Sequence, residues 1–395
     1  MAKRRGNGEG SIYFDEKRNR YEGQYFYEDP VTGERKRKKL TGKSKAAIAK
    51  RAKEFLAQVE KEREAYLAEQ SKGETVKEWL DTWLECYIRS GVRVKTYERY
   101  RCSIDNHIVP YIGSVAIGQL TAEDVQQMLN DLLDEGGENH QGLAPRTVNA
   151  ARRTLKTALE KAYHLKKISY NPVGGTKACR AEKAHITILT HEQAQTLLHI
   201  TKQQNQPAYM AILLAISTGM RLGEIMGLRW DSIDFPGKKL YVTQSLVSTS
   251  RGPLLEPAPK TNAGYRQIEL PKYCMEALQE HQNWQEHQKA EWLDQYLDEG
   301  LAVTNDNGRY IDPSYFSYAI FKKLLKQAGI PGNVRFHDLR HTHATWLLEK
   351  GVHPKVVAER LGHSSIRITL DTYSHVVKGL QQMAVSKLDE IADNW

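Results

Sequence analysis

The sequence predicts a multidomain α+β protein: a small three-stranded β-sheet with one helix, an all-α domain, and a mainly α-helical domain that holds a small β-sheet. Its 395 residues suffice for two or three domains with proper cores. Strand-like alternation lies near the amino terminus, and helical periodicity dominates afterwards. We therefore expect domains at 1–73, 74–172 and 187–395, with a linker at 173–186 that follows a Pro- and Gly-containing break.

Three short β-prone runs come first, at residues 11–15, 21–28 and 34–40. A turn signal at 29–33 joins the last two runs, and a helix is predicted from about 45 to 69. This order predicts a small antiparallel sheet covered by one helix.

The two faces of this sheet should differ. If the helix packs on the face that holds Ile12, Phe26 and Leu40, strand alternation sends a basic and aromatic set to the open face. The members of that set are Tyr25, Tyr27, Arg35, Arg37 and Lys39. Such a face suits entry into the major groove of DNA, and which of its residues contact bases stays open.

The charge distribution supports a nucleic-acid partner. The net charge is +9, and residues 1–53 carry 16 basic and 7 acidic side chains, whereas the remainder carries 41 of each. A basic segment attracts phosphate backbones in a salt-dependent way. The alternative is a basic tail that is merely solvated.

The middle of the chain reads as a compact helical domain. Thr75 and Glu78 form a capping box, and apolar residues at helical spacing follow, including two tryptophans that we expect in the core. Further helices are predicted at 96–108, 121–133 and 145–165.

The last domain combines several helices with two strands. Thr190 opens a capping box, and an apolar helix is expected at about 209–217. Strands are predicted at 239–245 and 265–270, and a helix from 337 to 350.

Six side chains of this last domain fit one chemistry, the cleavage of a phosphodiester by a tyrosine without a metal: Arg221, Lys260, His337, Arg340, His363 and Tyr373. Two guanidinium groups can hold the non-bridging phosphate oxygens. Two imidazoles can move protons near neutral pH. A tyrosine hydroxyl, with an ordinary pKa of about 10, attacks phosphorus only with a base or nearby positive charge.

Other interpretations exist for the single residues. Arg221 and Glu224 could be a surface ion pair on a helix. His337 and His341 could bind zinc from one helical face, although the sequence offers no evident third ligand. Tyr373 could be a packed residue among 20 tyrosines. The occurrence of all six positions in order argues for the joint site.

Four segments carry a resemblance to a known family. They are 217–224 (STGMRLGE), 337–340 (HDLR), 361–363 (LGH) and 372–375 (TYSH), and they are similar to the motifs of tyrosine recombinases, the lambda-type integrases. The resemblance covers essentially the whole chain. It implies that Tyr373 forms a 3'-phosphotyrosyl link, that Arg221 and Arg340 bind the scissile phosphate, and that His337 and His363 assist.

Lys260 is assigned through its position on a segment, 259–270, that resembles the catalytic hairpin of the family. A lysine there would protonate the departing 5'-oxygen, and Lys238, Lys239 and Lys272 are rivals for this role. Glu224 matches an acidic position of the family and is expected to orient Arg221 rather than to touch DNA.

The resemblance also gives roles to the other domains. Residues 1–73 resemble an arm-type DNA-binding domain, and 74–172 resemble the SAM-like core-binding domain. At two helix starts, where free N–H groups favour phosphate, the candidate DNA contacts are Lys95, Thr96, Arg99, Arg146, Thr147, Asn149 and Arg153. Ordinary surface charge is the alternative for each of them.

The expected function is site-specific recombination for a phage or another mobile element, performed by a homotetramer on two DNA duplexes. No cofactor or metal is chemically required, because the phosphotyrosyl bond conserves the energy of the phosphodiester. An excision factor and a host DNA-bending protein are further partners that the resemblance leaves open. The alternatives are a type IB topoisomerase and a catalytically silent DNA-binding regulator.

The remaining expectations concern location and the carboxyl end. No apolar run approaches 18 residues and no signal peptide is evident, which predicts a protein of the bacterial cytoplasm, associated with the nucleoid and not with a membrane. The four cysteines have no metal or disulfide spacing. The final apolar stripe comprises Val377, Leu380, Ala384, Leu388, Ile391 and Trp395, and it should dock on its own domain or on a second copy.

Overall fold

The computed structural model describes residues 11–16, 18–30, 34–71, 73–137, 139, 141–182, 186–257, 265–373, 385 and 388–392. The chain divides into two compact units, Met1–Glu182 and Lys183–Trp395. The α+β class predicted from the sequence is confirmed, because a three-stranded sheet with a helix and mainly helical parts with small sheets are all present.

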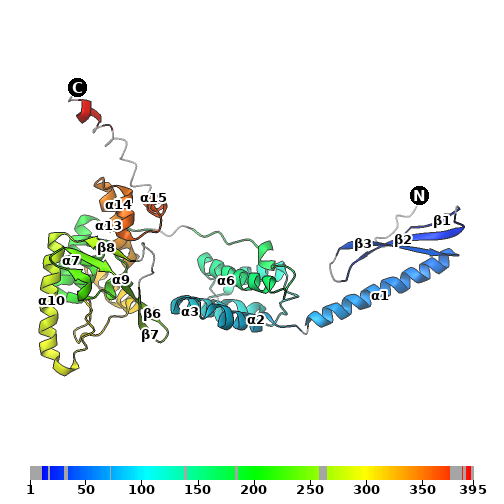
Figure 1. Cartoon of the computed structure of the whole chain (residues 1–395), viewed down its shortest axis with the longest axis horizontal. Coiled ribbons are helices and arrows are strands. Elements are labelled where there is room, and N and C mark those ends of the chain that lie inside the picture. Colours follow the sequence, from blue (N-terminus) through cyan, green and yellow to red (C-terminus); the bar gives the residue numbers. More distant parts are fainter. Residues whose placement is uncertain are drawn as a thin grey trace. The chain divides into compact units, whose positions relative to one another are not determined.

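The first unit begins with an antiparallel sheet of order β1-β2-β3, whose strands are Ser11–Asp15, Arg20–Glu28 and Arg35–Gly42. Helix α1 (Lys45–Ser71) lies along one face of this sheet (Figure 1). Gly23 permits this approach, since a Cβ atom there would come within 2.8 Å of Ile48 Cγ2. Ile48 is fully buried against the sheet.

The structure corrects the predicted faces of the sheet. Tyr25 pairs with Lys38 and is only 8% exposed under α1, and the Tyr27 ring packs edge-on against Phe55 of α1 at 5.0 Å. Phe26 pairs with Arg37 and is 50% exposed on the open face. The predicted faces of these three residues were therefore wrong: Tyr25 and Tyr27 face the helix, and Phe26 lies on the open face.

The basic part of that prediction stands. Arg35, Arg37 and Lys39 alternate with the helix-facing residues of β3 and lie on the open face with Phe26. Arg35 places its guanidinium 4.8 Å from the centre of the Phe26 ring. The open face is thus basic, and it also carries two exposed aromatic rings, Phe26 and Tyr13.

A bundle of helices completes the first unit. Its helices are α2 (Val76–Trp83), α3 (Val94–Ser103), α4 (Val109–Ile112), α5 (Ala122–Glu135) and α6 (Pro145–His164), with π-helical turns at Leu84–Ile88 and Ile104–Ile108. Thr75 caps α2 as predicted, and the buried Trp79 donates its Nε1 proton to the Ala158 carbonyl at 3.0 Å. Both predicted tryptophans, Trp79 and Trp83, lie in the core.

The segment after α6 packs on this bundle. Val173 is fully buried within the short turn Pro172–Gly175, and Arg152 Nε donates to Thr176 Oγ1 at 2.8 Å. The first residues of the expected linker 173–186 therefore hold to the helical domain. The proposed domain boundaries themselves stay a prediction.

The second unit surrounds a very apolar helix, α8 (Gln206–Thr218), in which eleven of thirteen residues are buried. Its other helices are α7 (His191–Gln204), α9 (Leu222–Met226), α10 (Lys272–Trp292), α11 (Pro313–Tyr315), α12 (Lys322–Gln327), α13 (Phe336–Glu349), α14 (Pro354–Leu361) and α15 (Ile366–Tyr373). Short helical turns lie at Trp230–Ser232, Leu293–Gln295 and Phe316–Phe321.

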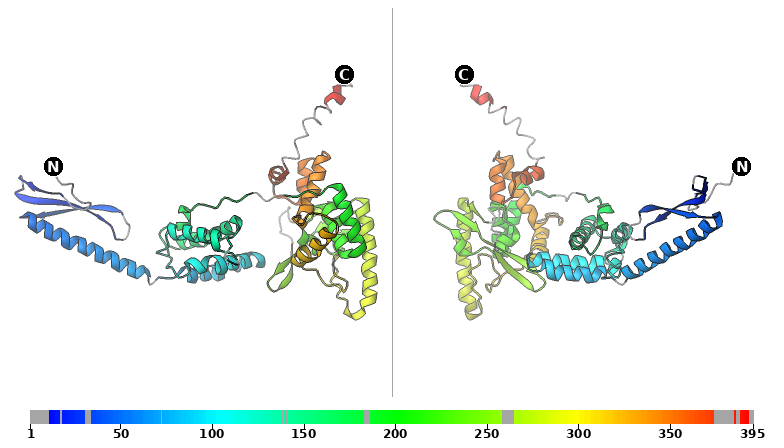
Figure 2. Two further views of the ribbon diagram at one scale, coloured as in Figure 1. Left: turned by 180° about the vertical axis from the view of Figure 1, so that it is seen from behind. Right: turned by 45° about the vertical axis from the view of Figure 1, so that its right-hand side comes forward.

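Two small sheets accompany these helices. One has the order β4-β5-β8, with strands Ile233–Asp234, Lys239–Val242 and Arg266–Glu269. The other is a hairpin of β6 (Gln244–Thr249) and β7 (Gly252–Pro257), which projects from the body of the unit (Figure 2). The strand predicted at 239–245 is thus divided between two sheets. Within the described parts of the chain, no helix has the length and apolarity to span a bilayer.

Candidate active site

Arg340 lies at the centre of the site. It comes from α13, its side chain is almost fully buried, and its Nη1 and Nη2 donate to the carbonyls of Gly219 and Leu361, each at 2.6 Å. Burial, followed by the charge of Arg221, lowers the pKa of Arg340 to about 9, so the group stays protonated at neutral pH. Three distant segments therefore meet at one guanidinium.

Arg221 is the second arginine of the site and begins α9. Its Nη1 donates to Glu224 Oε1 at 2.7 Å, and 44% of its side chain remains exposed. Unlike Arg340, it therefore offers free donors toward solvent. This is the arrangement that a phosphate clamp needs.

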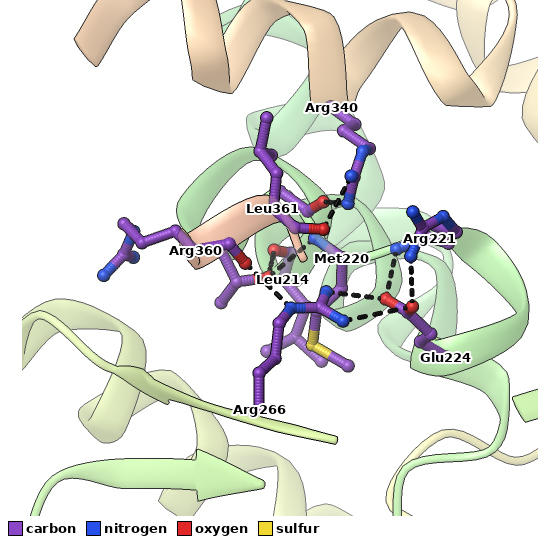
Figure 3. Close-up of polar contacts among 10 residues, drawn as sticks. Leu214, Met220, Arg221, Glu224, Arg266, Arg340, Arg360 and Leu361 are labelled. Carbon is purple, nitrogen blue, oxygen red and sulfur yellow. Dashed lines mark hydrogen bonds and ion pairs between the residues drawn. The ribbon is translucent and has the colours of Figure 1, made fainter. Parts of the chain in front are cut away.

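Glu224 is buried and also binds Arg266 of β8, which donates from Nη2 at 2.8 Å and from Nη1 at 3.2 Å (Figure 3). Burial alone would raise the pKa of Glu224, but the hydrogen bonds and charge of Arg266, together with Arg221, lower it to about 2. The carboxylate is therefore ionised and stands between two cations, as expected for a group that orients Arg221.

The two predicted histidines are neutral at pH 7. Desolvation, then neighbouring positive charge from Arg340 and Arg221, lowers the pKa of His363 to about 4. His363 Nδ1 lies 2.8 Å from Thr369 Oγ1, which fixes its ring. His337 is open to solvent on one side, yet partial desolvation and the nearby His341, Arg340 and Arg221 lower its pKa to about 4 as well.

Tyr373, at the end of α15, is only 2% exposed. Its hydroxyl lies 2.7 Å from Nδ1 of His341, and burial raises its pKa to about 12. The pKa of His341 is lowered, mainly by burial, and the tautomer of the neutral ring decides which partner donates in this hydrogen bond. In this conformation the hydroxyl is covered and already bonded to His341.

Five predicted residues thus come together from four parts of the chain: Arg221, His337, Arg340, His363 and Tyr373. Lys260 lies outside the described residues. Two neighbours were missed as site residues: Arg266, and His341, which had been considered only as a zinc ligand. Over the described ranges, no group of three or more His, Cys, Asp or Glu side chains is placed to hold a metal ion.

The predicted contacts of the helical domain divide into two kinds. Lys95, Arg99, Arg146 and Arg153 are exposed on α3 and α6, and with Thr96 and Thr147 they stay predictions. Asn149 is different, because its amide donates to the Cys179 carbonyl at 2.8 Å and accepts from the Cys179 N–H at 2.9 Å. Both ends of its amide thus hold the following segment, and its role as a DNA contact stays a prediction.

The carboxyl-terminal stripe is only partly described. Leu388 and Ile391 are exposed by 64% and 53%. Val377, Leu380, Ala384 and Trp395 lie outside the described residues. The docking of this tail stays a prediction.

Comparisons with known proteins agree with the predicted family. Residues 187–379 match the phage integrase family, and residues 75–133 match the phage integrase N-terminal SAM-like domain. The chain is 30% identical to a protein named tyrosine recombinase XerC-like from Caldanaerobacter subterraneus, over 86% of this chain and 92% of the relative.

Two solved structures have a similar fold. The Tn1549 transposon integrase in complex with a circular intermediate DNA is 22% identical, with a TM-score of 0.64 over 79% of this chain and 99% of that one. A lambda integrase tetramer bound to a Holliday junction is 21% identical, with a TM-score of 0.57 over 92% of this chain and 94% of that one.

Proposed function

Because the chain belongs to the phage integrase family of tyrosine recombinases, we propose that the cluster around Arg340 cleaves and rejoins DNA through a covalent bond to Tyr373. The enzyme is a DNA strand transferase that acts in site-specific integration and excision. The observation that carries the proposal is the convergence of two arginines, two neutral histidines and one tyrosine from four parts of the chain on one place.

The reaction is two transesterifications. In the first, Tyr373 Oη forms a bond to phosphorus while the bond from phosphorus to the 5'-oxygen breaks. Arg221 and Arg340 offset the charge on the non-bridging oxygens, which is greatest in the pentacoordinate transition state. In the second step a 5'-hydroxyl of the partner duplex attacks the phosphotyrosine and releases Tyr373.

Protons must move in both steps. The tyrosine proton passes to a neutral imidazole, for which His337 and His363 are suited because their lowered pKa values leave them unprotonated at pH 7. The departing 5'-oxygen takes a proton, and Lys260 is our proposal for its donor. The hydroxyl must first leave its buried contact with His341, since phosphate cannot reach a side chain that is 2% exposed.

The assembly and the DNA contacts are part of the same proposal. The lambda integrase is seen as a tetramer on a Holliday junction, and we propose the same assembly on two duplexes for this chain. Residues 1–73 would bind arm-type sites through the open face of the sheet, and 74–172 would bind core-type sites. An excision factor and a host bending protein remain proposed partners.

The test uses a nicked suicide duplex that carries the junction sequence of the element encoding the chain. Incubated without metal, the wild-type protein should form a protein–DNA adduct that survives denaturation, and Tyr373→Phe should form none. Shifted DNA without any adduct from the wild-type protein would favour a silent DNA-binding protein instead.

A further inference from the structure

The carboxyl end of α14, directly before His363, is held by an unusual pair of caps. The last four carbonyls of a helix have no partner within it. Here the Ala358 carbonyl accepts from the His363 N–H at 3.0 Å, and the Glu359 carbonyl accepts from the Gly362 N–H at 3.0 Å. Gly362 adopts the left-handed conformation, with φ of 66°, that this type of helix end requires.

Two arginines take the two remaining carbonyls. Arg266 Nε donates to the Arg360 carbonyl at 2.8 Å, and Arg340 Nη2 donates to the Leu361 carbonyl at 2.6 Å. Both cations also face the negative end of the helix dipole. The place where the chain turns into His363 is therefore set by one guanidinium from β8 and one from α13.

The other two nitrogens of the Arg266 side chain make a second set of hydrogen bonds. Nη1 and Nη2 bind the two oxygens of Glu224, and Glu224 in turn accepts from the backbone N–H of Arg221 at 2.9 Å and from its side chain (Figure 3). The Arg266 side chain is 5% exposed, so this ion pair is sheltered from water. One side chain thus links Arg221 to the helix end that precedes His363.

We propose that Arg266 is a positioning residue of the active site, which sets the distance between the Arg221 clamp and His363 by bonding Glu224 and the end of α14 together. The proposal rests on the proposed function of those two groups at the scissile phosphate. Arg266 makes no contact with DNA in this scheme and acts only through Glu224 and the Arg360 carbonyl.

The geometry calls for arginine. Its planar fork presents Nε toward a carbonyl and two terminal nitrogens toward a carboxylate at the same time. A lysine ammonium keeps the charge but cannot span the two acceptors. A misplacement of about 1 Å in an active site costs on the order of 10²-fold in rate, so Arg266→Lys and Arg266→Gln should both slow the chemistry about 10²-fold.

The experiment measures adduct formation with the suicide duplex in single turnover, at saturating concentrations of the full chain. For both Arg266 variants the rate constant should fall about 10²-fold, whereas the dissociation constant for DNA and the fraction of protein that reacts should stay at wild-type values. Glu224→Gln combined with Arg266→Gln should be no slower than the slower single variant. Arg229→Gln is the control, since Arg229 bonds Asp231 and the Glu299 carbonyl in the same unit, away from the site.

Each outcome has one meaning. An unchanged rate constant in both Arg266 variants, or a loss confined to the reactive fraction, would overturn the positioning role and leave Arg266 as a folding residue. Additive effects in the double variant would overturn its action through Glu224. Absence of a Tyr373-dependent adduct from the wild-type protein would instead overturn the proposed function.

Discussion

Two carboxylates in different units are each covered by cations, and the exposure of those cations differs. Glu224 binds Arg266, which is 5% exposed, whereas Glu22 of β2 binds Arg20 and Lys39, which are 39% and 48% exposed. Contact with Lys39, above all, lowers the pKa of Glu22 to about 2, the same value that Glu224 reaches, and burial opposes the shift in both. Basic side chains thus pair with a carboxylate in two settings, buried around Glu224 and exposed around Glu22.

In the second unit the charges of Glu224 and Arg266 are shielded from water and must stay paired. This ion pair therefore fixes the positions of both side chains. On the sheet the cations remain exposed to solvent and can still attract a phosphate backbone in a way that salt weakens. Changes in the first group should therefore alter stability and rate, and changes in the second should alter affinity.

The largest effect on stability is expected for Glu224→Gln, which leaves Arg266 buried without a counter-charge. The free energy of unfolding should fall by about 3 kcal/mol, and the cleavage rate should fall with it. Chemical denaturation measures the first quantity. Glu280→Gln is the matched control, because its pair with Lys202 is 58% and 50% exposed and should contribute less than about 1 kcal/mol.

The same variant has a pH signature. Since the pKa of Glu224 is lowered on folding, its stabilisation is fully present above the unfolded value of 4.5 and is lost as the pH falls toward 2. The difference in unfolding free energy between wild type and Glu224→Gln should thus narrow from pH 4.5 to pH 2. A difference that stays constant over this range would contradict the buried ion pair.

The next effect tests the faces of the amino-terminal sheet. Tyr25→Ala removes a buried ring under α1 and should lower protection of the β2 amides from hydrogen exchange by at least about 2 kcal/mol. Phe26→Ala, on the open face, should change it by less than about 0.5 kcal/mol. Equal effects of the two substitutions would mean that the helix does not cover the Tyr25 face.

The smallest effect is expected from a single exposed cation. Arg37→Gln should weaken binding to arm-type DNA modestly and reduce the dependence of log K on log salt by about 0.9, the share of one phosphate contact. The rate of cleavage at saturation should not change. Lys53→Gln, which removes the same charge from the exposed side of α1, serves as the control. Equal losses of affinity in both variants would indicate attraction by net charge alone.

The sequence predicted the amino-terminal strands, the capped helices and five members of the candidate site, because helix caps, strand runs and family motifs are local signals. The prediction failed for the two faces of the amino-terminal sheet, because the pairing between strands decides which residues lie on each face. Alternation sorts β2 into two sets, but only the register with β3 puts Phe26 beside Arg37 and sends Tyr25 under α1. Neither the strand nor its turn carries that information alone.

Arg266 and His341 were missed for another reason, since each acts through a contact with a residue far away in the sequence. A signal for Arg266 did exist. Arg266 and Ile268 lie on the same face of β8, and the exposed Gln267 lies on the other. Because Ile268 is apolar, this alternation places the charge of Arg266 on the buried face. A charge there requires a partner, but its identity depends on the approach of α9, which no local pattern describes.

The most direct test of the central claim is the chemical identity of the residue that becomes linked to DNA. The adduct from the suicide duplex would be digested with nuclease and protease, and the modified peptide sequenced by mass spectrometry. The account predicts a nucleotide attached through a 3'-phosphate to Tyr373. Attachment to any other side chain, with Tyr373 unmodified, would contradict it.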